Sequence, residues 1–67
     1  MKINNLNEIG QLIRKTRKEQ GLLQKDLALS AGTGIRLIIE LENGKRGVKI
    51  DTVIRICKLL GLSINIE

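Results

Sequence analysis

The chain has 67 residues, a formal net charge of +5 and no Phe, Tyr, Trp or His. This length allows one domain, residues 1–67, whose core must come almost entirely from eleven Leu and eleven Ile. With no His and only one Cys, Cys57, an intramolecular disulfide and a His/Cys metal cluster are excluded. No apolar run approaches the roughly 20 residues of a membrane span, and no signal-peptide core is present, so we expect a cytoplasmic protein with no membrane partner.

The first predicted helix covers about residues 6–20. Asn5 and Glu8 have the spacing of a helix N-cap and its third residue, and Gly21 is a typical C-terminal stop. One face of this helix is apolar and should pack on the core, and it carries Ile9, Leu12, Ile13 and Thr16.

Two short helices are predicted next, over about residues 24–30 and from residue 33 or 34 to residue 42. Leu27 faces inward in the first of them, and Ala28 is small enough for a close helix crossing. Ile38 and Leu41 are the inward pair of the second, and Gly32 can take a left-handed conformation at the corner between them. These features are typical of a helix-turn-helix over about residues 24–43.

A fourth helix is predicted to end at Gly61, with Asp51 or a residue just before it as the cap. Its predicted core face carries Ile50, Val53, Ile54, Cys57 and Leu60. Ile56 and Leu59 form a second apolar strip, which is more than a simple surface helix needs.

The tail at about residues 62–67 alternates apolar and polar residues, as a strand does. Such a tail either frays, pairs with Lys2-Ile3-Asn4, or pairs with another chain. The strict alternation favours a homodimer sealed by antiparallel tails. The predicted dimerisation residues are Ile56, Leu59, Leu62, Ile64 and Ile66.

The positive charge is concentrated at residues 14–18 and 45–49, while the carboxylates are scattered. A small basic domain attracts polyanions, chiefly nucleic acid or an anionic membrane, although the charge can also serve only to keep the protein soluble. Charge alone does not decide between these interpretations.

Five pieces of the sequence resemble the Cro/C1-type (XRE) helix-turn-helix repressor family: Gln24-Lys25-Asp26-Leu27-Ala28, Ala31-Gly32, Ile38, Leu41-Glu42-Asn43-Gly44-Lys45-Arg46 and Leu59-Leu60-Gly61-Leu62. The resemblance covers about residues 9–62 and implies an all-α, four-helix, lambda-repressor-like domain. The ending LSINIE is similar to the HipB-like antitoxin branch, in which the tails of two subunits pair into a small sheet and the dimer represses the operon of a HipA-like kinase toxin.

The resemblance implies that the third helix enters the DNA major groove. Arg36 is the main candidate for reading a base, since a bidentate Arg–guanine contact discriminates by about 1–3 kcal/mol. Ile35 and Ile39 would touch thymine methyl groups, or pack in a protein interface. Gly34 would permit close approach of the backbone, and Glu40 would accept from cytosine N4, unless it is solvated or paired with an Arg.

Phosphate contacts are implied at both ends of the helix-turn-helix. Gln24 and Lys25 begin the second helix, whose amides and dipole suit a phosphate. Asn43, Lys45 and Arg46 follow the third helix and would set affinity and register. A solvated surface is the alternative for each Lys.

The resemblance also implies a structural ion pair, Arg17 with Glu42, between the first and third helices. Some positions depart from the family pattern. Leu23 stands where Thr or Ser is usual, so the second helix should lack its side-chain cap, a loss of about 1 kcal/mol. Thr33 replaces an aliphatic residue and is itself a candidate cap for the third helix, while Ile35 stands where Gln or Arg often reads a base.

The leading hypothesis is a dimeric, sequence-specific repressor on a double-stranded DNA operator, the autoregulating antitoxin of a HipA-like toxin–antitoxin operon. The alternatives are a phage-type or stand-alone XRE regulator and a protein-interaction module that mainly binds a toxin. The sequence has no Ser/His or Cys/His arrangement, no carboxylates at metal spacing and no phosphate-cradling Gly motif. We therefore expect a protein that is not an enzyme and that binds no cofactor or metal.

Overall fold

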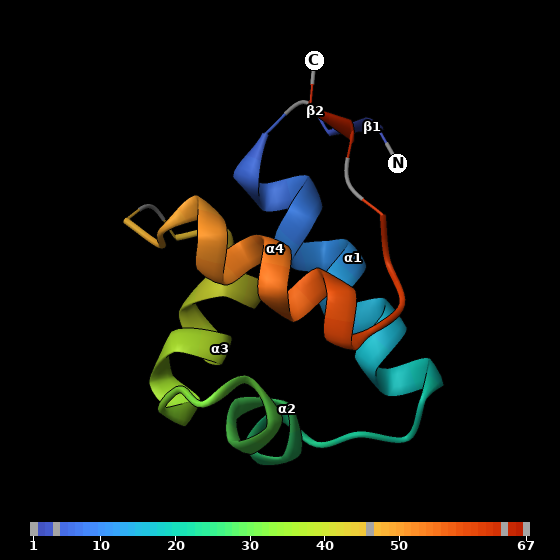
Figure 1. Ribbon diagram of the computed structural model, residues 1–67, viewed down its shortest axis with the longest axis vertical. Coiled ribbons are helices and arrows are strands. Elements are labelled where there is room, and N and C mark those ends of the chain that lie inside the picture. The colour runs from blue at the N-terminus through green and yellow to red at the C-terminus, as the bar shows by residue number, and fades with distance from the viewer. Residues whose placement is uncertain (1, 4, 46, 64, 67) are drawn as a thin grey trace.

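The computed structural model describes residues 2–3, 5–45, 47–63 and 65–66. Within these residues the chain forms helices α1 (Leu6–Glu19), α2 (Gln24–Ala31), α3 (Ile35–Glu42) and α4 (Ile50–Leu59), and strands β1 (Lys2–Ile3) and β2 (Asn65–Ile66). In Figure 1, α4 crosses in front of α1. Helices α2 and α3 lie at one end of the molecule, and the two strands lie at the other end. The prediction of an all-α, four-helix domain is confirmed.

Helix α1 begins as its sequence predicts. Asn5 has extended backbone angles, and its Oδ1 accepts a hydrogen bond of 2.9 Å from the backbone N–H of Glu8. This bond satisfies one of the N–H groups that the first turn of a helix leaves unpaired. Gln20 is the C-cap, and Gly21 follows with φ of +73°, which ends the helix where the glycine predicts.

The core lies where all four helices meet. Apart from Cys57, its largest fully buried side chains are aliphatic, which fits a composition without aromatic residues. Buried aliphatic area is the main favourable term available to so small a domain. The buried apolar residues are Ile9, Ile13, Leu27, Ala28, Ala31, Ile38, Leu41, Val53, Ile56, Cys57 and Leu60.

Helix α1 passes very close to the C-terminal end of α3 at Gly10. A Cβ atom at this position would clash with the carbonyl oxygen of Leu41 and lie 2.9 Å from the carbonyl oxygen of Glu42. Glycine is therefore required inside a helix, where it is otherwise unfavourable. The sequence interpretation did not identify Gly10.

The predicted core face of α4 is partly wrong. Ile50 and Ile54 are exposed, whereas Ile56, predicted to lie in a dimer strip, is completely buried. At 3.6 residues per turn Ile56 falls on the same stripe as Val53 and the other buried positions of the helix, and Ile54 falls beside that stripe. The helix also begins earlier than the Asp51 cap requires, since Lys49 is its N-cap. Ile56 thus stabilises the monomer and is unavailable for a dimer contact.

The C-terminal tail pairs within the chain. Strand β2 lies parallel to β1, with Lys2 opposite Asn65 and Ile3 opposite Ile66. This is one of the three outcomes that the alternating tail allowed, and it differs from the favoured antiparallel pairing between subunits, which stays a prediction. Leu62 is half-buried against the core, so it also contributes to the monomer. Ile64 lies outside the described residues, as does the side chain of Ile66.

Cys57 faces the core from α4 with 1% of its surface exposed, and burial raises the pKa of its thiol. A raised pKa leaves less of the reactive thiolate at pH 8. We expect Cys57 to resist a thiol reagent such as dithionitrobenzoate in the folded protein and to react fully in 6 M guanidinium chloride. Prompt reaction of the native protein at pH 8 would contradict this burial.

No described helix is both long enough and apolar enough to cross a lipid bilayer.

Candidate nucleic-acid interface

The α2–turn–α3 unit has the geometry that the sequence predicts. Gly32 takes the left-handed conformation with φ of +70°, and the backbone N–H of Thr33 donates to the carbonyl oxygen of Ala28 at 3.0 Å. Helix α3 then begins at Ile35, one or two residues later than expected, with Gly34 as its N-cap. Thr33 does not cap it, because its hydroxyl donates to the carbonyl oxygen of Gly34 at 3.2 Å.

Helix α3 presents one face to the core and the other to solvent. Ile38 and Leu41 are completely buried, as predicted, and they fix the orientation of the helix. On the opposite face, Ile35 and Ile39 are exposed, and the side chain of Arg36 is 89% exposed. An aliphatic helix that leaves two Ile and an extended Arg in solvent offers a surface for a partner.

A group of three charged side chains lies on the exposed side of α3. The Oε1 atom of Glu40 accepts from Arg36 Nε at 3.3 Å and from Lys45 Nζ at 3.4 Å. In the free protein Glu40 is thus paired with an Arg, which is one of the three possibilities that the sequence left open. Both contacts are long and exposed, so each cation can leave at small cost.

A groove of about 430 Å³ separates α3 from the start of α4. Leu37 and Val48 supply apolar parts of its lining, and Arg36, Glu40 and Lys49 supply charges. The groove therefore runs beside the surface of α3 on which the predicted base-reading residues lie. Sequence reasoning missed it, because the loop at residues 45–49 had no predicted conformation.

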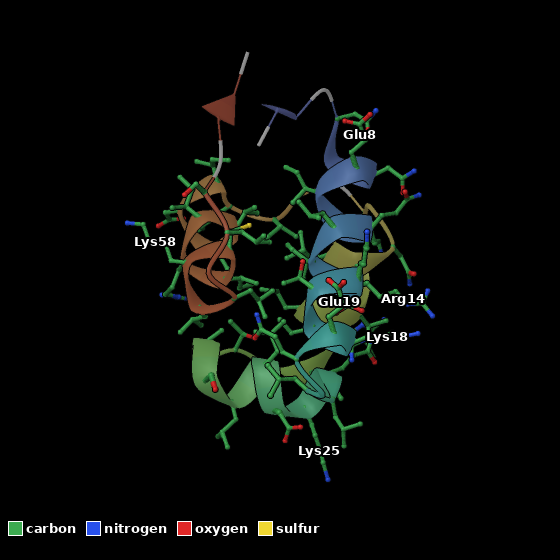
Figure 2. The ribbon with its side chains drawn as sticks, turned by 90° about the vertical axis from the view of Figure 1, so that its right-hand side faces the viewer. Glu8, Arg14, Lys18, Glu19, Lys25 and Lys58 are labelled. Atoms are coloured by element: carbon green, nitrogen blue, oxygen red, sulfur yellow. The ribbon has the colours of Figure 1, made fainter. Side chains whose placement is uncertain are left out.

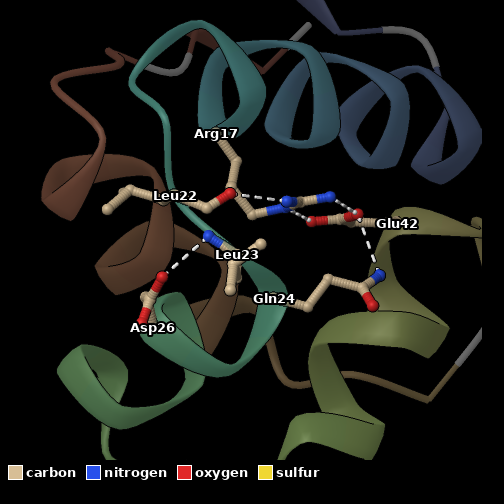
Figure 3. Close-up of polar contacts among 6 residues, drawn as sticks. All are labelled: Arg17, Leu22, Leu23, Gln24, Asp26 and Glu42. Atoms are coloured by element: carbon tan, nitrogen blue, oxygen red, sulfur yellow. Dashed lines mark hydrogen bonds and ion pairs between the residues drawn. The ribbon is translucent and has the colours of Figure 1, made fainter.

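The N-terminus of α2 is capped differently from the family pattern. Leu23 is the N-cap and provides no side-chain acceptor, as predicted, but its backbone N–H donates to Asp26 Oδ2 at 2.8 Å. Asp26 thus supplies half of a capping box and places a negative charge in the first turn, where the helix dipole favours it. Figure 3 shows this contact beside the buried ion pair.

Arg17 and Glu42 form the predicted ion pair between α1 and α3. Arg17 Nε lies 2.7 Å from Glu42 Oε2 and Nη2 lies 3.0 Å from Oε1, a bidentate geometry, with the residues 6% and 5% exposed. Arg17 Nη1 also donates to the carbonyl oxygen of Leu22 at 2.7 Å (Figure 3). The hydrogen bonds that Arg17 donates to Glu42 raise the pKa of Arg17 above its ordinary value, so the guanidinium stays charged although it is buried.

Gln24 extends this ion pair into α2. Its Nε2 donates to Glu42 Oε1 at 3.2 Å, so the side chain predicted to contact a phosphate is turned toward α3 in the free protein (Figure 3). Sequence reasoning missed this contact, because residues 24 and 42 meet only after α2 has folded against α3. Glu42 therefore links α1, α2 and α3.

The remaining predicted phosphate contacts lie at the surface. Lys25 projects from α2 at the end of the molecule opposite the strands (Figure 2), and Lys45 is 64% exposed. Asn43 is exposed as the C-cap of α3. Arg46 lies outside the described residues.

Lys49 lines the groove beside α3, but several other cations lie elsewhere on the domain. Figure 2 shows Arg14 and Lys18 projecting from α1 on the side opposite Lys58 of α4. Positive charge therefore surrounds the domain, and the distinguishing property of the α3 surface is its combination of exposed Ile residues, Arg36 and a partly exposed carboxylate.

Comparison with known proteins relates the chain to helix-turn-helix proteins. Residues 10–66 match the family model described as a helix-turn-helix domain. Over 59 residues, the chain is 48% identical to a protein of Sinorhizobium fredii named as the HTH-type transcriptional regulator y4mF, and the match covers 88% of this chain and 78% of that protein.

Proposed function

This chain belongs to the helix-turn-helix family of XRE-type, DNA-binding transcriptional regulators, and on that premise we propose that it is a dimeric repressor that recognises a specific operator through α3. The observation that carries the proposal is the division of α3 into two faces. Ile38 and Leu41 hold it rigidly on the core while Arg36 extends into solvent. A recognition element must be fixed in this way to read bases reproducibly.

In the proposed complex, α3 lies in the major groove with its N-terminal half at the base edges. Arg36 leaves Glu40 and forms a bidentate contact with guanine, and Ile35 and Ile39 contact thymine methyl groups. Gly34, which has open space around it, allows the backbone to approach the bases closely.

Phosphate contacts fix the position of α3 in the groove. The N-terminal amides of α2 and Lys25 face one stretch of backbone, and Gln24 joins them once its side chain leaves Glu42. The next stretch of backbone is contacted by Asn43 and Lys45 and, by its place in the sequence after α3, by Arg46. These contacts supply affinity and no sequence preference.

A homodimer places two copies of α3 in successive major grooves, about 34 Å apart. Exposed apolar residues on α4 support it, namely Ile50, Ile54 and Leu59. In the described residues, β2 pairs on one edge only, with β1, so its second edge is open to a strand from another subunit.

The similarity of the tail to HipB-like antitoxins supports a narrower proposal, in which the dimer represses its own operon and also binds a HipA-like kinase toxin. The exposed Ile50 and Leu59 are equally suited to contact such a toxin. Co-purification with a kinase encoded beside this gene would support that role. If no kinase gene lies beside this gene, a stand-alone regulator is favoured.

Variants at Arg36 and Lys45 should separate base reading from phosphate binding. With a duplex selected from a random pool by the wild-type protein, Arg36→Ala should lose preference at one base pair, worth about 1–3 kcal/mol. Lys45→Ala should weaken every duplex alike and make the dependence of log K on log salt shallower by about one unit. Fluorescence anisotropy at several salt concentrations measures both effects.

Arg14→Ala is the matched control, because Arg14 is an exposed cation on α1 to which the proposal assigns no contact with DNA or with a second subunit. It should leave affinity and preference close to the wild-type values. An affinity that does not change with salt, or identical behaviour of the Arg36 and Lys45 variants, would contradict the proposed division of roles.

A further inference from the structure

Glu40 occupies an unusual position for a surface that is to bind DNA. It is the carboxylate that α3 presents to solvent, since Glu42 is buried against Arg17. A single oxygen atom of Glu40 accepts from both Arg36 and Lys45, two cations that the proposed function assigns to DNA. DNA must therefore compete with Glu40 for both of them.

We propose that Glu40 is a specificity-determining residue, which lowers affinity for DNA of arbitrary sequence by competing with the duplex for Arg36 and Lys45. The inference rests on the proposed DNA-binding function and adds a role for a negative charge within the interface.

Competition by Glu40 lowers the binding affinity most for a duplex that lacks the operator sequence. Binding there depends on the neutralisation of phosphates by Lys and Arg. Two of these cations, Arg36 and Lys45, must first be released from Glu40. The released carboxylate then faces phosphates of like charge. No contact specific to a base offsets either cost, so the affinity for arbitrary sequence falls.

At the operator the same carboxylate acquires a partner. The N4 amino group of cytosine is a hydrogen-bond donor in the major groove, and Glu accepts from it. Arg36 is one helical turn from Glu40, so it can read a guanine while Glu40 meets a neighbouring cytosine. The loss of the Arg36 contact is then offset for the correct sequence alone.

The surroundings of the two side chains favour this exchange. The side chain of Glu40 is 32% exposed, whereas that of Arg36 is 89% exposed. Both side chains lie beside the groove that Leu37 and Val48 line, and the more exposed guanidinium is the one that can turn into solvent. Arg36 is therefore the mobile partner, and Glu40 is the fixed charge that remains at the interface.

Glu40→Gln tests the proposal, because it removes the charge and keeps the shape and a hydrogen-bond acceptor. Binding to a random-sequence 20-base-pair duplex should become about fivefold tighter, in keeping with the modest strength of exposed ion pairs. The slope of log K against log salt should steepen by about one unit or more as cations become free to contact phosphates. Affinity for a duplex selected by the wild-type protein should rise less, so the ratio of the two affinities should fall.

Glu19→Gln is the control of equal charge, since Glu19 is exposed on α1 (Figure 2). It should tighten binding to the random duplex by less than about twofold, the effect of net charge alone. Equal effects of the two variants, or weaker binding by Glu40→Gln, would overturn the role of Glu40 and leave the proposed function standing. Wild-type protein that binds no duplex in a salt-dependent manner would overturn both.

Discussion

Arg17→Met should lower the free energy of unfolding by about 3–5 kcal/mol, because it leaves the carboxylate of Glu42 buried without its charged partner. Met is close to Arg in length and fills much of the same space, so lost packing contributes little. The variant also removes the bond to the carbonyl oxygen of Leu22, which helps to hold the α1–α2 connection. Far-UV circular dichroism during urea unfolding measures the change, since the chain has no aromatic residue to report by fluorescence.

Arg14→Met provides the control, as Arg14 is an exposed cation on the same helix. Its effect should be within about 0.5 kcal/mol of zero. In the double variant Arg17→Met with Glu42→Met, much of the lost stability should return, because neither charge then remains unpaired in the interior. If Arg17→Met and Arg14→Met have similar effects, the pair does not stabilise the junction of α1 and α3.

Gly10→Ala should destabilise the protein by about 2 kcal/mol, although helix propensity alone predicts a gain of about 1 kcal/mol. The added methyl group meets the carbonyl oxygens of Leu41 and Glu42, which are backbone atoms and cannot rotate away. The helices must therefore separate at this crossing. Thermal unfolding monitored at 222 nm measures the effect.

Gly34→Ala is the matched control for Gly10→Ala, because a Cβ atom at Gly34 would enter open space. The backbone of Gly34 is extended, a conformation that any residue adopts. The substitution should cost about 0.5 kcal/mol through the weaker N-cap that Ala provides. A stabilised Gly10→Ala variant would show that α1 and α3 are farther apart than described.

Local patterns in the sequence were sufficient to predict most of the fold. Asn5 before Glu8 fixes the start of α1, and Gly32 fixes the corner of the helix-turn-helix, because each acts through atoms only a few residues away. The inward face of α3 was predictable for a similar reason, since Ile38 and Leu41 are three residues apart, as residues on one face of a helix are.

The errors occurred where distant parts of the chain decide the outcome. Helix α4 is apolar on several sides, so periodicity could not show which Ile residues face the core, and Ile56 was assigned outward. The role of Gly10 depends on the backbone of Leu41 and Glu42, far along the chain, and the contact of Gln24 with Glu42 depends on the packing of α2 on α3. For the residues predicted to contact DNA, the structure shows which side chains are exposed and where they lie, and the contacts themselves stay predictions.

The pairing of β1 with β2 joins residues from opposite ends of the sequence. This pairing closes a loop of almost the whole chain, so its entropic cost is the highest of any contact described. Only two residues of each strand form the pairing that offsets this cost. The helices, by contrast, meet through shorter loops and bury the core. In kinetic terms, the strand pairing belongs late in folding, after the helical body has brought the two ends together. Loss of the strand pairing would leave the helical body intact. A strand from a second subunit could therefore replace the intramolecular partner strand without unfolding the domain.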